Sequence, residues 1–156
     1  RNELEASLVL YYTGVSRESA NIIKEQITHT QKGDKENLES MHQMKKQAEA
    51  MKEALLRGEF ENFSQCLLQG WEAKKRAARS ITNTFLDALY RYALEHGGKS
   101  AKISGAGGGG FMMIYCDPCG KTALVRALQA KAEPGGAVLT PSFTEIGTQA
   151  WTIYKN

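Results

Sequence analysis

The chain has 156 residues, which is enough for one domain with a hydrophobic core of ordinary size. Its composition is that of a globular protein, with 42% hydrophobic residues, 24% charged residues and a formal net charge of +3. So small a charge, with basic residues scattered among acidic ones, argues against nucleic-acid binding. No apolar run approaches the roughly 18–20 residues that cross a bilayer, so we expect no membrane partner and a cytoplasmic protein. The chain begins at Arg1 rather than Met, and we therefore expect a fragment of a longer protein.

A strand followed by a polar turn opens the chain. Residues Leu4–Thr13 predict an inner strand of a covered sheet, because apolar side chains occupy both of its faces. Gly14 ends this strand, and a helix is expected to follow. Thr13, Gly14 and Arg17 therefore lie at a strand-to-helix turn, where a guanidinium group can bind phosphate or carboxylate in a bidentate manner. A surface ion pair between Arg17 and Glu18 explains this arginine equally well.

Three further amphipathic helices are expected after this turn. Asp34 suits the N-cap of the first, which carries an apolar stripe that we interpret as core. The stripe consists of Leu38, Met41, Met44, Ala48, Met51 and Leu55. The second helix runs into a basic segment, residues 74–76, which is typical of a solvated face. The third is expected to start at Ser80 or Thr82 and to stop at Gly97.

A glycine-rich segment, Lys-Ile-Ser-Gly-Ala-Gly-Gly-Gly-Gly-Phe, occupies residues Lys102–Phe111. Glycine loses more backbone entropy on folding than any other residue, so such a run destabilises unless special backbone angles or close approach to a ligand require it. Strand-like residues flank the run, at Ala101–Ser104 and Phe111–Cys116. Successive backbone N–H groups in a loop held in this way form an anion site, and phosphate is the usual ligand. A flexible linker or a tight hairpin turn is the alternative.

Three familiar nucleotide-binding motifs do not fit this segment. Gly105, Gly107 and Gly110 satisfy the dinucleotide pattern G-x-G-x-x-G, but a strand follows them where that motif requires a helix. Gly98-Lys99-Ser100 resembles the end of the phosphate loop of nucleoside triphosphatases, yet Ala93 stands where its first glycine belongs. The V-A-I-K, H-R-D and D-F-G segments that accompany the glycine-rich loop of protein kinases are absent.

Two cysteines, Cys116 and Cys119, form a C-x-x-C at a predicted strand-to-helix junction. A redox pair of the thioredoxin type would lie at such a junction, where a helix N-terminus lowers the pKa of a thiol. We favour a buried cysteine at the strand end with an incidental neighbour, and a thiol–disulfide enzyme is the alternative. No second ligand pair accompanies the motif and the histidines show no ligand spacing, so we expect no metal site.

The remainder of the chain predicts a short helix and short strands. Asp117-Pro118 suits a helix start, and Glu133–Gly136 suits a turn. The expected strands are Ala137–Leu139, Ser142–Ile146 and Thr148–Tyr154. Because parallel βαβ alternation is missing, the predicted fold class is α+β, with a mostly antiparallel sheet and a helical layer on one face. We expect residues 1–156 to form a single domain.

The glycine-rich segment closely resembles the third conserved motif of the GHMP kinases, the superfamily of galactokinase and of homoserine, mevalonate and phosphomevalonate kinases. The resemblance extends to Tyr12–Arg17, Trp71–Lys75 and Asp87–Tyr90, and it is strongest for the branch that acts on sugar phosphates such as heptose 7-phosphate. It implies the ferredoxin-like fold of the GHMP C-terminal domain. It also implies transfer of the γ-phosphoryl group of Mg-ATP to a sugar-phosphate hydroxyl, the anomeric one of a heptose 7-phosphate.

The same resemblance implies roles for individual residues. Lys102 would add positive charge beside the nucleotide phosphates, and one lysine of residues 71–76 would face the substrate. Thr13, Gly14 and Arg17 would lie on the substrate side. The loop residues expected to close over the phosphates are Ser104, Gly105, Ala106, Gly107, Gly108, Gly109 and Gly110.

The chain also departs from the superfamily pattern. Its main ATP-phosphate motif, P-x-x-x-G-L-G-S-S, is absent, as are the segments that provide the catalytic aspartate and the magnesium ligand. In these kinases such segments belong to the N-terminal half. We therefore expect a C-terminal domain that works with its own N-terminal domain and is inactive alone. A non-catalytic module that binds nucleotide or another anion is the alternative function.

Overall fold

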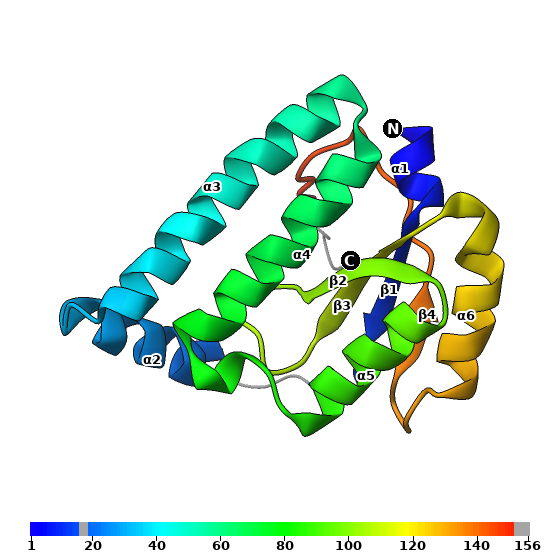
Figure 1. Cartoon of the computed structure of the whole chain (residues 1–156). Helices are drawn as coiled ribbons and strands as arrows, with labels where there is room; N and C mark the ends of the chain where they lie inside the picture. Colours follow the sequence, from blue (N-terminus) through cyan, green and yellow to red (C-terminus); the bar gives the residue numbers. More distant parts are fainter. Residues whose placement is uncertain (16–18, 152–156) are drawn as a thin grey trace.

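A computed structural model of the chain describes residues 1–15 and 19–151. Within these ranges, one sheet of four antiparallel strands has the order β2-β3-β1-β4 (Figure 1). The strands are β1 (Leu8–Tyr12), β2 (Gly98–Ile103), β3 (Phe111–Cys116) and β4 (Ala137–Leu139). The α-helices are α1 (Asn2–Ala6), α2 (Ser19–Gln31), α3 (Lys35–Arg57), α4 (Phe60–Ala77), α5 (Thr84–Glu95) and α6 (Lys121–Ala130), with short 3-10 helices η1 (Arg79–Ile81) and η2 (Pro118–Gly120). The predicted α+β class with an antiparallel sheet is confirmed.

The main core lies on one face of the sheet. Val9 and Tyr11 of β1 point to this face, together with Met112 and Ile114 of β3, and all four are fully buried. Helices α4, α5 and α6 pack against them through Trp71, Leu86, Leu89, Leu124 and Leu128. The alternation of the strands therefore explains the core, because side chains two residues apart share a face.

The hairpin of α3 and α4 runs along β2 and covers that edge of the sheet (Figure 1). Phe63 of α4 packs edge-to-face on Tyr115 of β3, with ring centroids 5.6 Å apart. The hydroxyl groups of Ser64 and Ser100 lie 2.8 Å apart in a buried hydrogen bond between α4 and β2. These contacts fix the N-terminal half of α4 on β2 and β3, and its C-terminal half meets the glycine-rich loop, where Lys74 contacts the carbonyl of Gly105.

The chain starts with a helix where the sequence predicts a strand. Helix α1 occupies Asn2–Ala6, and β1 begins only at Leu8. Glu3 and Glu5 lie in the first turn of α1. Carboxylates there are stabilised by the positive end of the helix dipole, and leucine and alanine are good helix formers. Both effects favour a helix over a strand in this segment.

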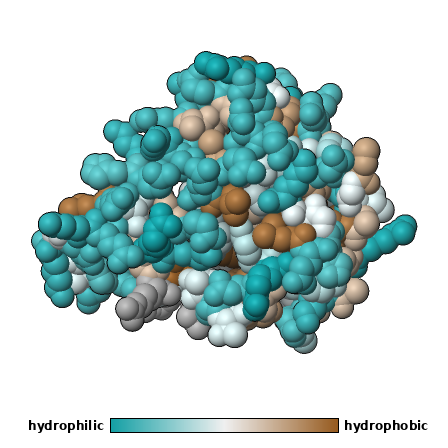
Figure 2. Space-filling view, in the orientation of Figure 1, coloured by the Kyte–Doolittle hydropathy of each residue, from teal (hydrophilic) through white to brown (hydrophobic). Residues whose placement is uncertain are grey.

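Helix α3 buries polar side chains, and only part of the predicted apolar stripe reaches the core. Asp34 caps it as predicted, because its carboxylate accepts the backbone N–H of Asn37. The buried residues of α3 are Asn37, Ser40, Gln47 and Ala54. Met41 and Leu55 of the stripe are 43% and 39% exposed, and the surface over α3 is largely hydrophilic (Figure 2). The core prediction holds for Met44 and Met51, which are half-buried and pack against the core. It fails for Met41 and Leu55, because α3 packs chiefly on α4, whose contact face decides what α3 buries.

Helix α5 begins later than predicted. Its N-cap is Asn83, whose side chain accepts the N–H of Leu86 at 2.9 Å. Thr82, one of the two predicted starts, instead donates its hydroxyl to the Asp87 carboxylate at 2.8 Å. The predicted stop is confirmed, since Gly97 follows the helix with a φ of 105°.

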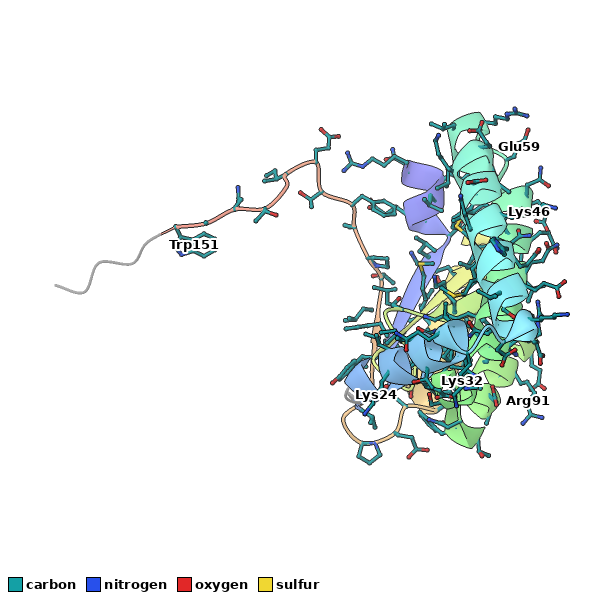
Figure 3. All side chains as sticks on the ribbon, turned by 90° about the vertical axis from the view of Figure 1, so that its left-hand side faces the viewer. Lys24, Lys32, Lys46, Glu59, Arg91 and Trp151 are labelled. Atoms are coloured by element: carbon teal, nitrogen blue, oxygen red, sulfur yellow. The ribbon has the colours of Figure 1, made fainter. Side chains whose placement is uncertain are left out.

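The C-terminal segment forms one of the three predicted strands, β4, which pairs with β1. The segment Ser142–Ile146 does not form the predicted strand. Its hydrogen bonds include two to the Glu5 carboxylate, which accepts the N–H of Phe143 at 2.9 Å and the Ser142 hydroxyl at 3.1 Å. Residues 148–151 have no regular structure and run away from the sheet, and Trp151 is 77% exposed (Figure 3). Residues 152–154 of the predicted last strand lie outside the described residues.

Over the described ranges, no helix combines the length and the apolar composition that a membrane span requires.

Candidate functional site

The glycine-rich loop, Ser104–Gly110, connects β2 to β3. Its base is closed by the N–H of Ser104, which donates to the carbonyl of Phe111 at 2.8 Å. All of its glycines adopt left-handed backbone angles, with φ between 73° and 154°. Other residues rarely tolerate such angles, so this is a built connection between two strands and not a flexible linker.

Two neighbouring segments anchor the middle of the loop. The N–H of Gly108 donates to the carbonyl of Ile81 at 2.8 Å, and that of Gly110 donates to the carbonyl of Val15 at 2.8 Å. Gly110 also lies 3.0 Å from the hydroxyl of Thr13. The loop is therefore tied to the end of β1 and to η1 at once.

Glycine is required at two loop positions because the protein's own backbone approaches closely. A Cβ atom on Gly107 would lie 2.8 Å from the carbonyl oxygen of Ile81, and one on Gly109 would lie 2.7 Å from that of Val15. Real Cβ atoms do not come so close to backbone oxygen. Part of the glycine run thus serves packing within the protein.

The internal bonds restrict which amides can bind an anion. The N–H groups of Ser104, Gly108 and Gly110 donate to carbonyl groups of the protein itself. In the described part of the chain, the amides of Gly105, Ala106, Gly107 and Gly109 have no acceptor. Gly105 is exposed and Ala106 half-buried, so these two are the accessible donors.

The residues predicted on the substrate side take different places. Thr13 is buried, and its hydroxyl lies between the Gly110 amide and the Val15 carbonyl, so the structure brings it to the loop. Gly14 packs on the turn after α6, where an added Cβ would lie 3.0 Å from Gly135. This contact gives a packing reason for glycine at position 14, because a side chain there would press on the backbone of the turn. Arg17 lies outside the described residues.

Two lysines stand beside the start of the loop. Lys102 is on β2, and Lys74 of α4 donates its ammonium to the carbonyl of Gly105. Burial, with a smaller contribution from the charge of Lys102, lowers the pKa of Lys74 to about 8. The next lysine along α4, Lys75, is paired with Glu72 at 2.8 Å.

The sequence did not show which lysine of the basic run faces the loop. Helical spacing contains the signal, since Lys74 follows the buried Leu67 and Trp71 at steps of seven and three residues and so shares their face.

The C-x-x-C pair is not an activated thiol site. Cys116 is fully buried, and burial raises the pKa of its thiol, whereas Cys119 is exposed. A reactive thiol needs both a lowered pKa and access to its substrate. The thiol–disulfide alternative is therefore set aside, in favour of the buried cysteine at a strand end.

A magnesium ion in phosphoryl transfer is held by one or two carboxylates together with substrate phosphates. The described residues contain no group of three or more His, Cys, Asp or Glu side chains placed to hold a metal ion. The loop surroundings offer hydroxyl groups and lysines, so they do not fit the ion.

Comparison with known proteins identifies the family. The family described as GHMP kinases C terminal matches residues 51–134, more than half of the chain. The chain belongs to the GHMP kinase family. The D-glycero-alpha-D-manno-heptose 7-phosphate kinase of Campylobacter jejuni is 40% identical over 152 residues, which cover 97% of this chain and 43% of that kinase.

Solved structures of GHMP kinases share the fold. A D-glycero-D-manno-heptose 1-phosphate kinase from Bacteroides thetaiotaomicron is 30% identical with a TM-score of 0.63, over 99% of this chain and 38% of that one. The mevalonate kinase of L. major, in complex with R-mevalonate, has a TM-score of 0.73 at 19% identity, over 88% of this chain and 43% of that one, and supports the fold alone. The chain thus spans less than half the length of these relatives. The family resemblance seen in the glycine-rich segment is confirmed.

Proposed function

We propose that the protein to which this chain belongs transfers the γ-phosphoryl group of ATP to a hydroxyl group of a sugar phosphate, with the anomeric hydroxyl of a heptose 7-phosphate as the acceptor. The observation that carries this proposal is the 40% identity, across 97% of the chain, with a heptose 7-phosphate kinase. The names of the two heptose kinases agree on a phosphorylated heptose and differ in the position of the phosphate. The choice of the anomeric hydroxyl as the group that receives the phosphate is therefore part of the proposal.

In this reaction the acceptor oxygen attacks the γ-phosphorus, its proton passes to a base, and the bond to the β-phosphate oxygen breaks to release ADP. Negative charge spreads over the γ-phosphate oxygens, so rate depends on positioning and on fixed donors. This chain would supply the amides of Gly105 and Ala106 as donors to the nucleotide phosphates. A magnesium ion would neutralise phosphate charge, and we expect the base and the metal ligands in the N-terminal domain of the intact kinase.

The test is ADP release by the full-length protein. The acceptors are D-glycero-D-manno-heptose 7-phosphate, the same heptose without phosphate, galactose, mevalonate and homoserine. We expect turnover confined to the heptose phosphate, and phosphorus NMR of the product should show a new anomeric phosphate. Turnover on another acceptor, or on none, contradicts the proposal.

A non-catalytic module that binds an anion is the second candidate. The amides of Gly105 and Ala106 can donate to an anion without any catalytic group from another domain. Titration of ATP into the full-length protein without acceptor should then shift the resonances of these two amides. Turnover in the ADP assay would reject this candidate, whereas binding without turnover would favour it.

A further inference from the structure

A groove between α3 and α4 opens beside the glycine-rich loop. It has a volume of about 160 Å³, and none of the residues that line it is acidic. Apolar side chains form its wall and two lysines stand at its end. The residues important here are Met44, Met51, Leu67, Trp71, Lys74 and Lys102. A largely apolar pocket with a few convergent polar groups is the usual form of a small-molecule site.

The two ammonium groups at the end of the groove have no acidic partner among the side chains that the structure describes. Their neighbours on the same elements do, since Lys75 of α4 pairs with Glu72 at 2.8 Å and Lys99 of β2 pairs with Glu61 at 2.9 Å. Two cations that face each other in a partly buried site repel. A bound anion would remove this repulsion, so the arrangement suits an anionic ligand.

Trp71 forms part of the groove wall. It is 2% exposed and lines the groove, yet its indole N–H is buried and has no acceptor within the described residues. Buried indole N–H groups are normally hydrogen-bonded. Because this N–H has no accessible surface, a ligand in the groove does not reach it, and Trp71 contributes its ring to the apolar wall.

We propose that this groove binds the phosphate monoester that the acceptor sugar already carries, with Lys74 and Lys102 on its oxygens. This inference rests on the proposed function. A volume of about 160 Å³ is well below that of pockets for nucleotide-sized ligands and suits a phosphate with a short carbon chain. The amides of Gly105 and Ala106 do not line the groove, which leaves them for the phosphates of ATP.

The arrangement also gives the kinase its discrimination. A sugar without phosphate would leave both ammonium groups partly buried and unpaired, and a site built for a charged group rejects analogues that lack it. Lys74 contacts the carbonyl of Gly105 as well, so the loaded groove lies directly beside the first accessible amide of the loop. The acceptor would thus be held next to the nucleotide phosphates.

The kinetic test uses the full-length protein with Lys74→Gln and Lys102→Gln, and with Lys75→Gln and Lys99→Gln as matched controls on the same helix and strand. We expect the KM for heptose 7-phosphate to rise about tenfold or more in each groove variant, because a charge-assisted bond to phosphate is lost. The KM for ATP should stay unchanged, and Lys74→Arg should recover most of the loss. A rise in the KM for ATP alone would assign the lysines to the nucleotide and overturn the proposal.

Binding of inorganic phosphate, measured by calorimetry without ATP or sugar, separates the two proposals. We expect Lys74→Gln and Lys102→Gln to weaken binding and Lys75→Gln to leave it unchanged. Absence of turnover together with Lys74-dependent phosphate binding would contradict the proposed function and leave the groove as a phosphate site. Turnover on heptose 7-phosphate together with phosphate binding that is unchanged in Lys74→Gln and Lys102→Gln would overturn the groove proposal alone.

Discussion

Lys74 couples the protonation of the protein to anion binding, because burial and the charge of Lys102 lower its pKa to about 8. An anion on its ammonium favours the charged form and raises the pKa in the complex. Binding therefore takes up a proton, and affinity falls as pH rises through 8. The other titratable groups that line the groove are Lys102 and Cys66.

Sulfate is a suitable probe for this coupling, because its own charge is constant in this pH range. Calorimetry in two buffers of different ionisation enthalpy should show uptake of about half a proton per sulfate at pH 8 and about a tenth at pH 7. Lys74→Gln should abolish the uptake, whereas Cys66→Ser should retain it. Uptake that persists without Lys74 would show that another group titrates.

Gly107 offers a test of the close packing in the loop. Gly107→Ala would place a Cβ atom 2.8 Å from the carbonyl oxygen of Ile81 at a φ of 119°. We expect a loss of about 3 kcal/mol in the free energy of unfolding, from overlap and backbone strain together. Gly105→Ala is the matched control, since it has a φ of 73° and no atom within 4 Å, and should cost about 1 kcal/mol. Equal losses in urea unfolding would contradict the packing argument.

At the scale of elements, a buried polar contact holds α3 in addition to its half-buried methionines Met44 and Met51. Asn37 is 2% exposed, donates to the carbonyl of Ala77 at 2.7 Å, and accepts the hydroxyl of Thr30 at 2.9 Å. It thus ties α2, α3 and the end of α4 together. Asn37→Ala removes both bonds and leaves a buried carbonyl unpaired, which should cost about 2 kcal/mol.

The matched variant for this element is Met41→Gln, on the same helix but 43% exposed. It should change the free energy of unfolding by less than about 0.5 kcal/mol, as surface substitutions generally do. Thermal unfolding of the two variants distinguishes the polar contact from the stripe. A larger loss for Met41→Gln than for Asn37→Ala would contradict the importance of the polar contact.

At the scale of the whole molecule, we expect the 156-residue chain alone to release no ADP above background. Its described residues contain no carboxylate cluster for a metal ion, and its relatives are more than twice as long as the part that it matches. The assay compares the chain with the full-length protein at equal concentration. A cooperative thermal transition of the isolated chain serves as its control for folding, and turnover comparable to that of the full-length protein would contradict the expectation.

The sequence by itself determined the features that depend on local residue types. The run from Gly107 to Gly110 between two apolar segments predicted a positioned loop, and the resemblance of this segment to a known motif predicted the family. The order of the elements predicted the α+β class. Asp34 and Gly97 marked helix ends correctly, because capping and left-handed angles are properties of single residues.

Only the tertiary structure decided which groups remain available for a ligand. Ile81 and Val15 occupy two loop amides, α4 selects the buried face of α3, and the end of β2 brings Lys102 to Lys74. Each of these contacts joins segments that are distant in the chain. Periodicity records which side of a helix or strand is apolar, but it does not record which partner will lie there.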